Sequence, residues 1–208
     1  MKILNLYAGI GGNRKLWTPN GNEHEITAVE LNPEIAAVYQ EFYPNDIVIV
    51  ADAHEYLLEH YKEFDFIWAS PPCPSHSEIR RCVVYKGQVS ALYPDMSLYQ
   101  EIILLGYFSK CPYVVENVKP YYTPLIDAPL IGRHLFWSNF LILPFNKKDN
   151  RIHNDIKVDS TVYGVSLVGK NIEKKVRLLR NMVNPELGKH ILDCAMGAEI
   201  KTEEQELF

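Results

Sequence analysis

The feature that most constrains the fold of this 208-residue chain is a repeated alternation of short apolar runs with amphipathic stretches. The apolar runs lie at residues 2–7, 25–29, 47–50, 64–68 and 113–115. Their length and composition are typical of buried strands. Strands that alternate with helices form a mostly parallel sheet with helices on both faces. The pattern therefore predicts an α/β fold with a doubly wound, mostly parallel sheet.

The spacing of apolar residues also predicts the helices, at residues 32–42, 54–61, 97–110, 171–181 and 185–196. Residues 133–139 and 140–144 are typical of two strands joined by a tight turn, which predicts a C-terminal β-hairpin. Residues 78–94 have no clear period and are interpreted as a long loop. We divide the chain into a main domain at 1–143, a basic region at 144–174, closing helices at 175–198 and an acidic tail at 199–208.

Charge and composition limit the class of protein. The net charge is −5, yet the segment 144–180 holds an excess of Lys and Arg. Such a segment fits either an ordinary solvated face or a surface that binds phosphates. The four cysteines form no Cys-x-x-Cys pair, so neither a zinc site nor a disulfide framework is predicted. No apolar run reaches the 18 residues of a membrane helix, so we expect a cytoplasmic protein with no membrane partner.

Polar residues and glycines gather where the predicted strands end. A Gly-Ile-Gly-Gly run at 9–12 follows the first strand, Glu30 the second, Asp52 the third, Cys73 the fourth and Glu116 the fifth. The carboxyl ends of parallel strands are where α/β proteins bind their ligands. Each feature alone has an ordinary structural alternative: a bare glycine turn, a helix cap at Asp52, or a buried cysteine in a Pro-rich turn.

Taken in order, these features resemble the DNA cytosine-5 methyltransferases. Residues 6–12 (Leu-Tyr-Ala-Gly-Ile-Gly-Gly) resemble the family's first motif, residues 70–73 (Ser-Pro-Pro-Cys) its catalytic motif, and residues 116–118 its Glu-Asn-Val motif. Residues 181–185 (Asn-Met-Val-Asn-Pro) are similar to its last motif. The resemblance implies a Rossmann-like S-adenosylmethionine-dependent methyltransferase fold. It also implies S-adenosylmethionine as cofactor, no metal, and a nucleic-acid substrate.

The resemblance assigns roles to individual residues. The implied cofactor-binding set is Tyr7, Ala8, Gly9, Gly11, Glu30, Leu31, Asp52, Ala53, Pro72, Leu98, Asn181 and Val183. The implied catalytic set is Cys73, Glu116 and Arg133. A cysteine thiolate that adds to C6 of cytosine makes C5 nucleophilic enough to take a methyl group, and a nearby carboxyl group can offset the charge on the ring. The base must first leave the helix, so base flipping is implied.

This chain also departs from the family pattern. Pro74 replaces the glutamine that usually follows the cysteine, and a single arginine, Arg133, is followed by His134 where two spaced arginines are usual. We interpret Arg133 as the residue that supports Glu116 or the base. Only about 30 residues, 144–174, remain for a target-recognition region, which is the size of a compact phage-encoded or orphan member. Either the sequence specificity is short or relaxed, or a partner subunit or a second copy supplies further contacts with DNA.

Nucleic-acid contacts are predicted at Ser77, Arg80, Arg81, Lys147, Lys148 and Arg151. The predicted activity is methylation of C5 of cytosine in double-stranded DNA, as in a restriction-modification system. One alternative is the same chemistry on RNA, such as tRNA. The other is a catalytically inert nucleic-acid-binding subunit that keeps the cofactor fold.

Overall fold

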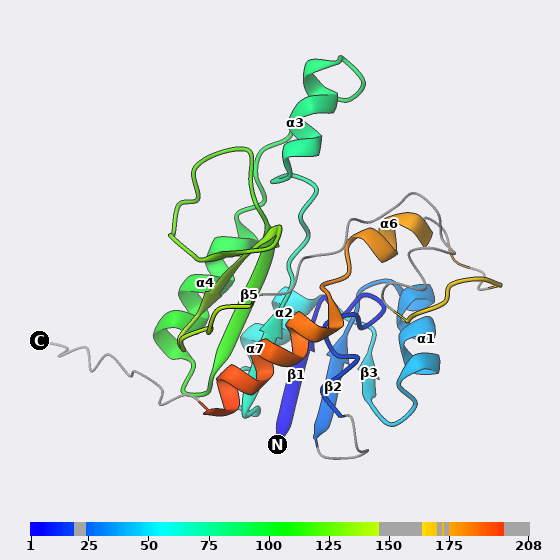
Figure 1. Cartoon of the computed structure of the whole chain (residues 1–208), viewed down its shortest axis with the longest axis vertical. Helices are drawn as coiled ribbons and strands as arrows, with labels where there is room; N and C mark the ends of the chain where they lie inside the picture. Colours follow the sequence, from blue (N-terminus) through cyan, green and yellow to red (C-terminus); the bar gives the residue numbers. More distant parts are fainter. Residues whose placement is uncertain (19–23, 146–163, 170–171, 173–174, 198–208) are drawn as a thin grey trace, which may run out of the picture.

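The computed structural model describes residues 1–18, 24–145, 164–169, 172 and 175–197. In this part of the chain, a seven-stranded sheet has the order β3-β2-β1-β4-β5-β7-β6 (Figure 1). The pairs among β3, β2, β1, β4 and β5 are parallel, and β7 is antiparallel to both β5 and β6. The strands are β1 (Lys2–Leu6), β2 (Glu25–Val29), β3 (Ile47–Ile49), β4 (Phe66–Ala69), β5 (Tyr113–Val118), β6 (Leu130–Ile131) and β7 (His134–Ser138). The α/β fold with a mostly parallel sheet is confirmed.

Helices cover both faces of the sheet, as doubly wound topology requires. Helices α2 (Ala53–His60) and α4 (Ser97–Phe108) pack on one face, against Leu4, Leu6 and Ile67. Helices α1 (Pro33–Phe42) and α7 (Pro185–Gly197) pack on the other. The short helix α6 (Lys175–Arg180) precedes α7, and α3 (Glu78–Tyr85) projects away from the sheet (Figure 1). In the described residues, no helix combines the length and the apolar character needed to cross a membrane.

Side chains of the strand-end residues cap two of these helices. Asn32 accepts hydrogen bonds from the backbone N–H groups of Glu34 and Ile35 at the start of α1. Asp52 accepts in the same way from His54 and Glu55 at the start of α2. Such caps satisfy N–H groups that have no partner within the helix. The structural alternative for Asp52, a helix cap, is therefore present in the fold.

Several predicted boundaries are wrong. The hairpin pairs β6 with β7 through a turn at Gly132, whose φ of 63° is favourable for glycine, and residues 140–144 form no strand. Phe140 instead turns into the core beside Phe66. Strand β5 extends through Val118 because β7 pairs with it up to that residue, so Glu116 lies within the strand and not beyond its end.

Residues 78–94 are also not a loop throughout. Residues 78–85 form helix α3, which begins where the hydroxyl of Ser77 accepts from the N–H of Arg80. None of the α3 side chains is buried, although its apolar residues Ile79, Cys82 and Val83 recur at helical spacing, and the helix is only eight residues long.

The C-terminal helix α7 is pressed against the segment that follows β1. A Cβ atom on Gly188 would lie 2.2 Å from the backbone oxygen of Asn13, so only glycine permits this contact. The indole N–H of Trp17 donates to the carbonyl of Gly188 at 3.1 Å. The Asn13 side chain in turn donates to Asn5 within β1, at 2.8 Å. Residues 13–17 therefore form turns that are anchored to α7.

A buried ion pair holds the same segment to α1 and the following turn. Arg14 donates to both carboxylate oxygens of Asp46, at 2.6 and 2.7 Å, and the hydroxyl of Tyr39 donates to the same carboxylate at 2.8 Å. The two charged side chains are only 8% and 3% exposed. Removal of one partner from a buried pair leaves an uncompensated charge.

Asp46→Asn is therefore expected to lower the free energy of unfolding by about 3–5 kcal/mol, measured by urea denaturation. The matched control is Asp193→Asn, which breaks the exposed Lys189–Asp193 pair and is expected to cost less than about 1 kcal/mol. If the two variants lost the same free energy of unfolding, the buried pair would contribute no more to stability than the exposed one.

Candidate active site

A cavity of about 390 Å³ lies at the carboxyl ends of the central parallel strands. Its walls come from the segments that follow β1, β2 and β4, from β5, and from the residues around α6. Strands β1 and β4 are neighbours where the strand order reverses, which is the switch point at which open α/β sheets bind ligands. The volume is also in the range of pockets for small ligands, about 300–1,000 Å³.

The glycine turn and Glu30 form one side of the cavity. The backbone N–H of Gly9 donates to one oxygen of the Glu30 carboxylate at 3.0 Å, and the N–H of Asn32 donates to the other at 2.9 Å. Gly9 has a φ of 55°, and a Cβ atom placed on it would meet nothing within 4 Å, so this turn leaves open space beside the cavity. Each Glu30 oxygen keeps a lone pair that can accept from a hydroxyl group of a ligand.

Tyr7 occupies a strained position at the start of the same turn. Its φ is 55°, which among the described residues makes it the one non-glycine residue with positive φ. Such a conformation costs a bulky residue about 1–3 kcal/mol and persists where the surroundings fix it. The Tyr7 hydroxyl donates a short hydrogen bond to Glu101, which lies on α4.

The loop after β4 brings Cys73 to the opposite side of the cavity. The Asn117 side chain on β5 donates to the carbonyl of Pro71 at 2.9 Å, which ties this loop to the neighbouring strand. The carbonyl of Cys73 accepts from the N–H groups of His76 and Ser77, at 3.0 and 3.2 Å. The thiol-bearing residue is thus half-buried on a loop held at both ends.

The pKa of the Cys73 thiol lies above its usual value, chiefly because of burial and then because of the charge of Glu116. The arginines Arg177 and Arg133 act in the opposite direction, since a nearby cation favours the thiolate. A reactive cysteine needs an electropositive setting that favours its thiolate, and these two arginines supply part of it. Protonation of Glu116 would remove the opposing charge.

Glu116 lies on β5 beside this loop. In the register of β4 and β5, Ala69 pairs with Val115, which brings Glu116 next to Ser70. Burial raises the pKa of Glu116 to about 7, and the Ser70 hydroxyl and the charge of Arg133 limit the rise. The carboxyl group is therefore poised to carry a proton at neutral pH, as a general acid requires.

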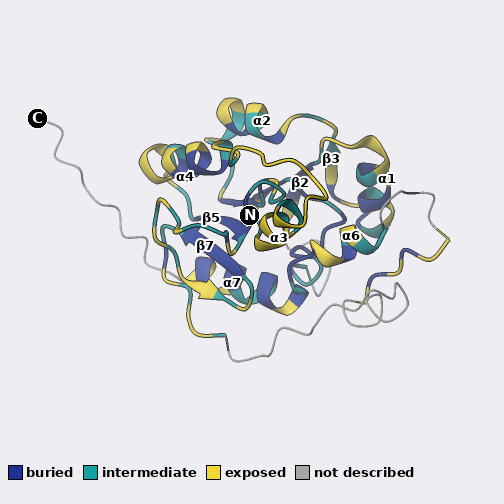
Figure 2. Cartoon of the chain, turned by 90° about the horizontal axis from the view of Figure 1, so that it is seen from above, coloured by how far each residue is buried: buried dark blue, intermediate teal, exposed yellow. Residues whose placement is uncertain are grey.

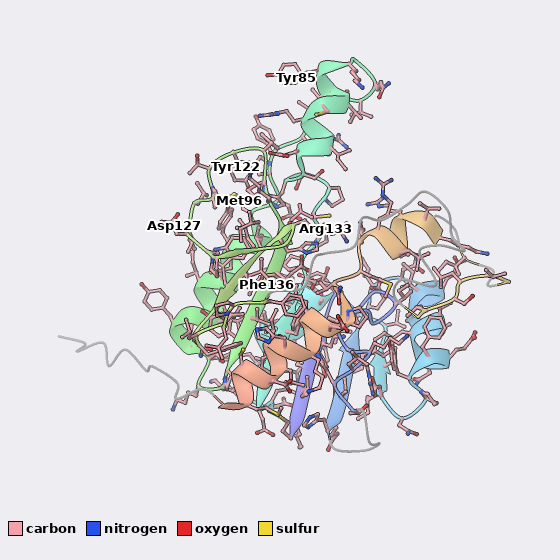
Figure 3. The ribbon with its side chains drawn as sticks, in the orientation of Figure 1. Tyr85, Met96, Tyr122, Asp127, Arg133 and Phe136 are labelled. Carbon is pink, nitrogen blue, oxygen red and sulfur yellow. The ribbon has the colours of Figure 1, made fainter. Side chains whose placement is uncertain are left out.

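The hairpin contributes Arg133 and His134 to the same cavity. Arg133 donates to the carbonyl oxygens of Arg180 and Met182, at 2.9 and 3.2 Å, and so joins the hairpin turn to the segment after α6 (Figure 3). His134 Nε2 lies 3.6 Å from the Glu116 carboxylate. Burial, with the charge of Arg133, lowers the pKa of His134 to about 3, so its imidazole is uncharged. The His134 side chain beside Glu116 is therefore neutral and does not form an ion pair with it.

The cavity brings together most of the residues predicted for the site. They are Tyr7, Ala8, Gly9, Glu30, Pro72, Cys73, Glu116, Arg133, Asn181 and Val183. The segment holding the last two lies close over the glycine turn, since a Cβ atom on Gly12 would meet the Met182 side chain at 2.8 Å.

Five predicted cofactor residues lie outside the cavity lining in this structure: Gly11, Leu31, Asp52, Ala53 and Leu98. Gly11 faces the rings of Tyr43 and Tyr39, and Leu98 is buried in the core under α4. Ala53 is buried in that core too, whereas Leu31 is exposed to solvent.

The predicted nucleic-acid contacts separate into two groups. Ser77, Arg80 and Arg81 begin the projecting helix α3. Lys147, Lys148 and Arg151, with most of the basic region 144–174 and the tail 199–208, lie outside the described residues.

Sequence reasoning missed several lining residues. Ser70 and Asn117 belong to the motifs quoted for Cys73 and Glu116, but their hydrogen bonds to Glu116 and Pro71 have no local signature. Arg177 and Arg180 were visible as part of the basic segment, without a sign that they face the cavity. In the described part of the chain, no group of three or more His, Cys, Asp or Glu side chains is placed to hold a metal ion.

The doubly wound sheet, with a ligand-sized cavity at its switch point, defines a Rossmann-like α/β protein. Residues 1–103 match the family model of the C-5 cytosine-specific DNA methylases. This stretch, just under half of the chain, is a C-5 cytosine-specific DNA methylase domain. The family match identifies S-adenosylmethionine as the cofactor.

Individual relatives cover only part of the chain. A tRNA (cytosine(38)-C(5))-methyltransferase from Spodoptera frugiperda is 35% identical over 75 residues, which are 35% of this chain and 23% of that protein. The chain thus spans less than a quarter of the length of this curated relative. Among solved structures, a mutant of Spodoptera frugiperda DNMT2 is 25% identical, with a TM-score of 0.40, over 57% of this chain and 35% of that one. A SAM-dependent methyltransferase from Agrobacterium tumefaciens is 14% identical, with a TM-score of 0.41, over 59% and 40% of the two chains.

The residues of the cavity fit such a cofactor. The open side of Gly9 permits close approach to the backbone, and Glu30 retains acceptor capacity of the kind that ribose hydroxyls use. Asn181 and Val183 line the same cavity.

Proposed function

We propose that this protein transfers a methyl group from S-adenosylmethionine to C5 of cytosine in DNA. The observation that carries the proposal is that a single cavity joins a half-buried thiol and a buried carboxyl group, Cys73 and Glu116, to a glycine turn and Glu30. The first pair can act on a base, and the second pair can hold the cofactor. A base that enters this cavity has left its stack, so the proposal includes base flipping.

The proposed roles follow from the chemistry of cytosine. The Cys73 thiolate adds to C6, and the electron pair of the 5,6 double bond becomes available at C5. Glu116, in its protonated form, donates to N3 and so offsets the negative charge that develops on the ring. When bound, the cofactor would supply an electrophilic methyl group; C5 takes it as the S–CH3 bond breaks, and S-adenosylhomocysteine leaves with that electron pair. Loss of the C5 proton to a base then expels the Cys73 thiolate and restores the double bond.

Helix α3 and the stretch after it, residues 77–95, form an arm beside the cysteine loop. The arm is mostly exposed (Figure 2) and carries Arg80, Arg81 and Lys86. In the proposed function, this arm contacts the phosphates that flank the target base, because cations bind nucleic-acid backbones by releasing counterions.

Arg81→Glu is expected to weaken nucleic-acid binding about tenfold and to reduce the slope of log affinity against log salt by about one. Fluorescence anisotropy with a labelled substrate at several salt concentrations measures both quantities. The control is Lys62→Glu, the same charge change at an exposed residue after α2, remote from the cavity lining. An unchanged salt slope for Arg81→Glu would remove the arm from the interface.

RNA is the second candidate substrate, and two observations favour it. The curated relative is a tRNA methyltransferase by name. The arm also exposes two aromatic rings, Tyr85 at 85% and Tyr93 at 96%, and Tyr85 lies at its outer end (Figure 3). Exposed rings stack readily on unpaired bases, which loops of RNA offer and a DNA duplex does not.

Two assays test the proposal. Purified protein is incubated with methyl-labelled S-adenosylmethionine and either duplex DNA or tRNA, and the nucleosides are then separated by mass spectrometry. Label in 5-methyldeoxycytidine is the result expected, whereas label in 5-methylcytidine alone would move the activity to RNA. Cofactor binding without transfer to either substrate would favour an inert subunit. Methylation-sensitive sequencing of DNA from cells that express the protein then gives the sequence context.

A further inference from the structure

Helix α4 carries a carboxyl group, Glu101, that is completely buried although it lies outside the cavity. Two side chains from other parts of the chain converge on the same oxygen of this group. The hydroxyl of Tyr7, 94 residues away, donates to Glu101 Oε1. The Nδ1 atom of His54, at the start of α2, lies 3.1 Å from that oxygen. The described residues provide no hydrogen-bond partner for the second oxygen, Oε2.

The two partners of Glu101 sit where the chain turns at the ends of β1 and β3. Tyr7 lines the cavity and begins the turn that places Gly9 beside Glu30. His54 follows Asp52, the N-cap of α2. The buried carboxyl group of Glu101 therefore links two strand-end segments that are far apart in the sequence, at Tyr7 and at His54.

We propose that Glu101 is a positioning residue for the cofactor, acting through its hydrogen bond with Tyr7. The inference rests on the proposed function, in which the turn at Tyr7–Gly9 holds S-adenosylmethionine. Glu101 itself does not line the cavity, so its effect on the cofactor passes through the Tyr7 side chain.

The strain at Tyr7 gives the physical reason. A tyrosine at a φ of 55° reverts to a relaxed backbone unless its side chain is held, and the relaxed form would displace the N–H of Gly9. The Glu101 contact holds the end of the ring. A buried carboxyl group with an unpartnered oxygen is itself unfavourable, and burial raises the pKa of Glu101. A buried carboxyl group is unfavourable, and here it contacts a residue with a strained backbone. Such strain is typical of binding and active sites, where the surrounding structure holds one conformation.

The test is the affinity for S-adenosylhomocysteine, measured by isothermal titration calorimetry without any nucleic acid. Glu101→Leu, which removes the acceptor, and Tyr7→Phe, which removes the donor, are each expected to weaken binding about 10- to 100-fold, the size expected for one hydrogen bond to a charged group. The double variant is expected to bind S-adenosylhomocysteine no more weakly than the more affected of the two single variants, because both changes break the same hydrogen bond. The control is Tyr113→Phe, which removes a buried hydroxyl from the same core cluster and is expected to leave the affinity unchanged.

Each outcome decides a different point. If the wild-type protein does not bind the ligand, the proposed function fails and this inference fails with it. If the wild-type protein binds and both single variants bind equally well, only the role of Glu101 is overturned. Losses that add in the double variant would also overturn it, since Glu101 would then act independently of Tyr7. Should Glu101→Leu fail to fold, the comparison of Tyr7→Phe with Tyr113→Phe decides the matter, because Tyr7→Phe removes only the hydroxyl.

Discussion

Cys73→Ala is expected to abolish methyl transfer, with a loss of about 10⁴-fold or more, while binding of S-adenosylhomocysteine is retained. Removal of a covalent nucleophile leaves only binding and electrostatic stabilisation to accelerate the reaction. Transfer of the labelled methyl group measures the loss. A substrate with fluorine in place of hydrogen at C5 checks the proposed adduct, because no proton can leave C5 and the Cys73–C6 bond persists.

The matched control for this variant is Cys111→Ala. Cys111 is also half-buried, and burial raises the pKa of its thiol as well, but it lies before β5 at the end of the sheet away from the cavity. Its variant is expected to keep full activity. Full activity in Cys73→Ala, or a fluorinated adduct that still forms in that variant, would eliminate the proposed mechanism.

Glu116→Gln is expected to lower kcat about 10²- to 10⁴-fold, the range for loss of a general acid. It should also change the pH profile. The reactive form needs a thiolate at Cys73 and a proton on Glu116, whose pKa is about 7. In the wild-type protein, kcat/KM rises up to about pH 7 and then levels off, because each further gain in thiolate is offset by loss of the Glu116 proton. Above the raised pKa of the Cys73 thiol, kcat/KM falls.

Without the carboxyl group, this compensation is lost. The residual activity of Glu116→Gln is expected to keep rising through pH 7 until the thiol is ionised. Parallel profiles for the two proteins would show that Glu116 carries no proton in the reaction.

The same substitution should stabilise the fold at high pH. The pKa of Glu116 is 4.5 as the reference value and about 7 in the folded protein, so the folded state binds the proton more tightly. The contribution of this group to stability is full below pH 4.5 and is lost as the pH rises through 7, at a cost of about 3 kcal/mol by pH 8. Glu116→Gln is therefore expected to be more resistant to urea than the wild-type protein at pH 8, with a smaller difference at pH 5.

Local sequence was sufficient for the features that depend on neighbouring residues. The strand runs, the caps at Asn32 and Asp52, and the glycine turn beside Glu30 all have signals within a few positions. The carboxyl ends of parallel strands then meet by topology, which brought Cys73 and Glu116 to one cavity.

Long-range side-chain contacts were not predictable in this way. The bond between Tyr7 and Glu101 joins residues 94 positions apart, and both fit other roles in the sequence. Arg133 lies in the hairpin turn and His134 begins β7, so which of the two lies beside Glu116 follows from the register of β7 with β5 and not from composition. Helix α3 did have a local signal, a serine cap at Ser77 followed by apolar residues at helical spacing, but it covers only eight residues inside a longer stretch without a clear period.

The contact between Gly188 and Asn13 has a consequence for the way the protein is made. The glycine turn and the cysteine loop are synthesised early. The surface of α7 that contacts Asn13 and Trp17 is synthesised near the end. A nascent chain that has not yet reached α7 leaves Trp17, which is 2% exposed in the finished protein, without its cover. The lining of the cavity is therefore complete only once residues 177–183 have been made, and shorter nascent chains expose apolar surface that the finished protein buries.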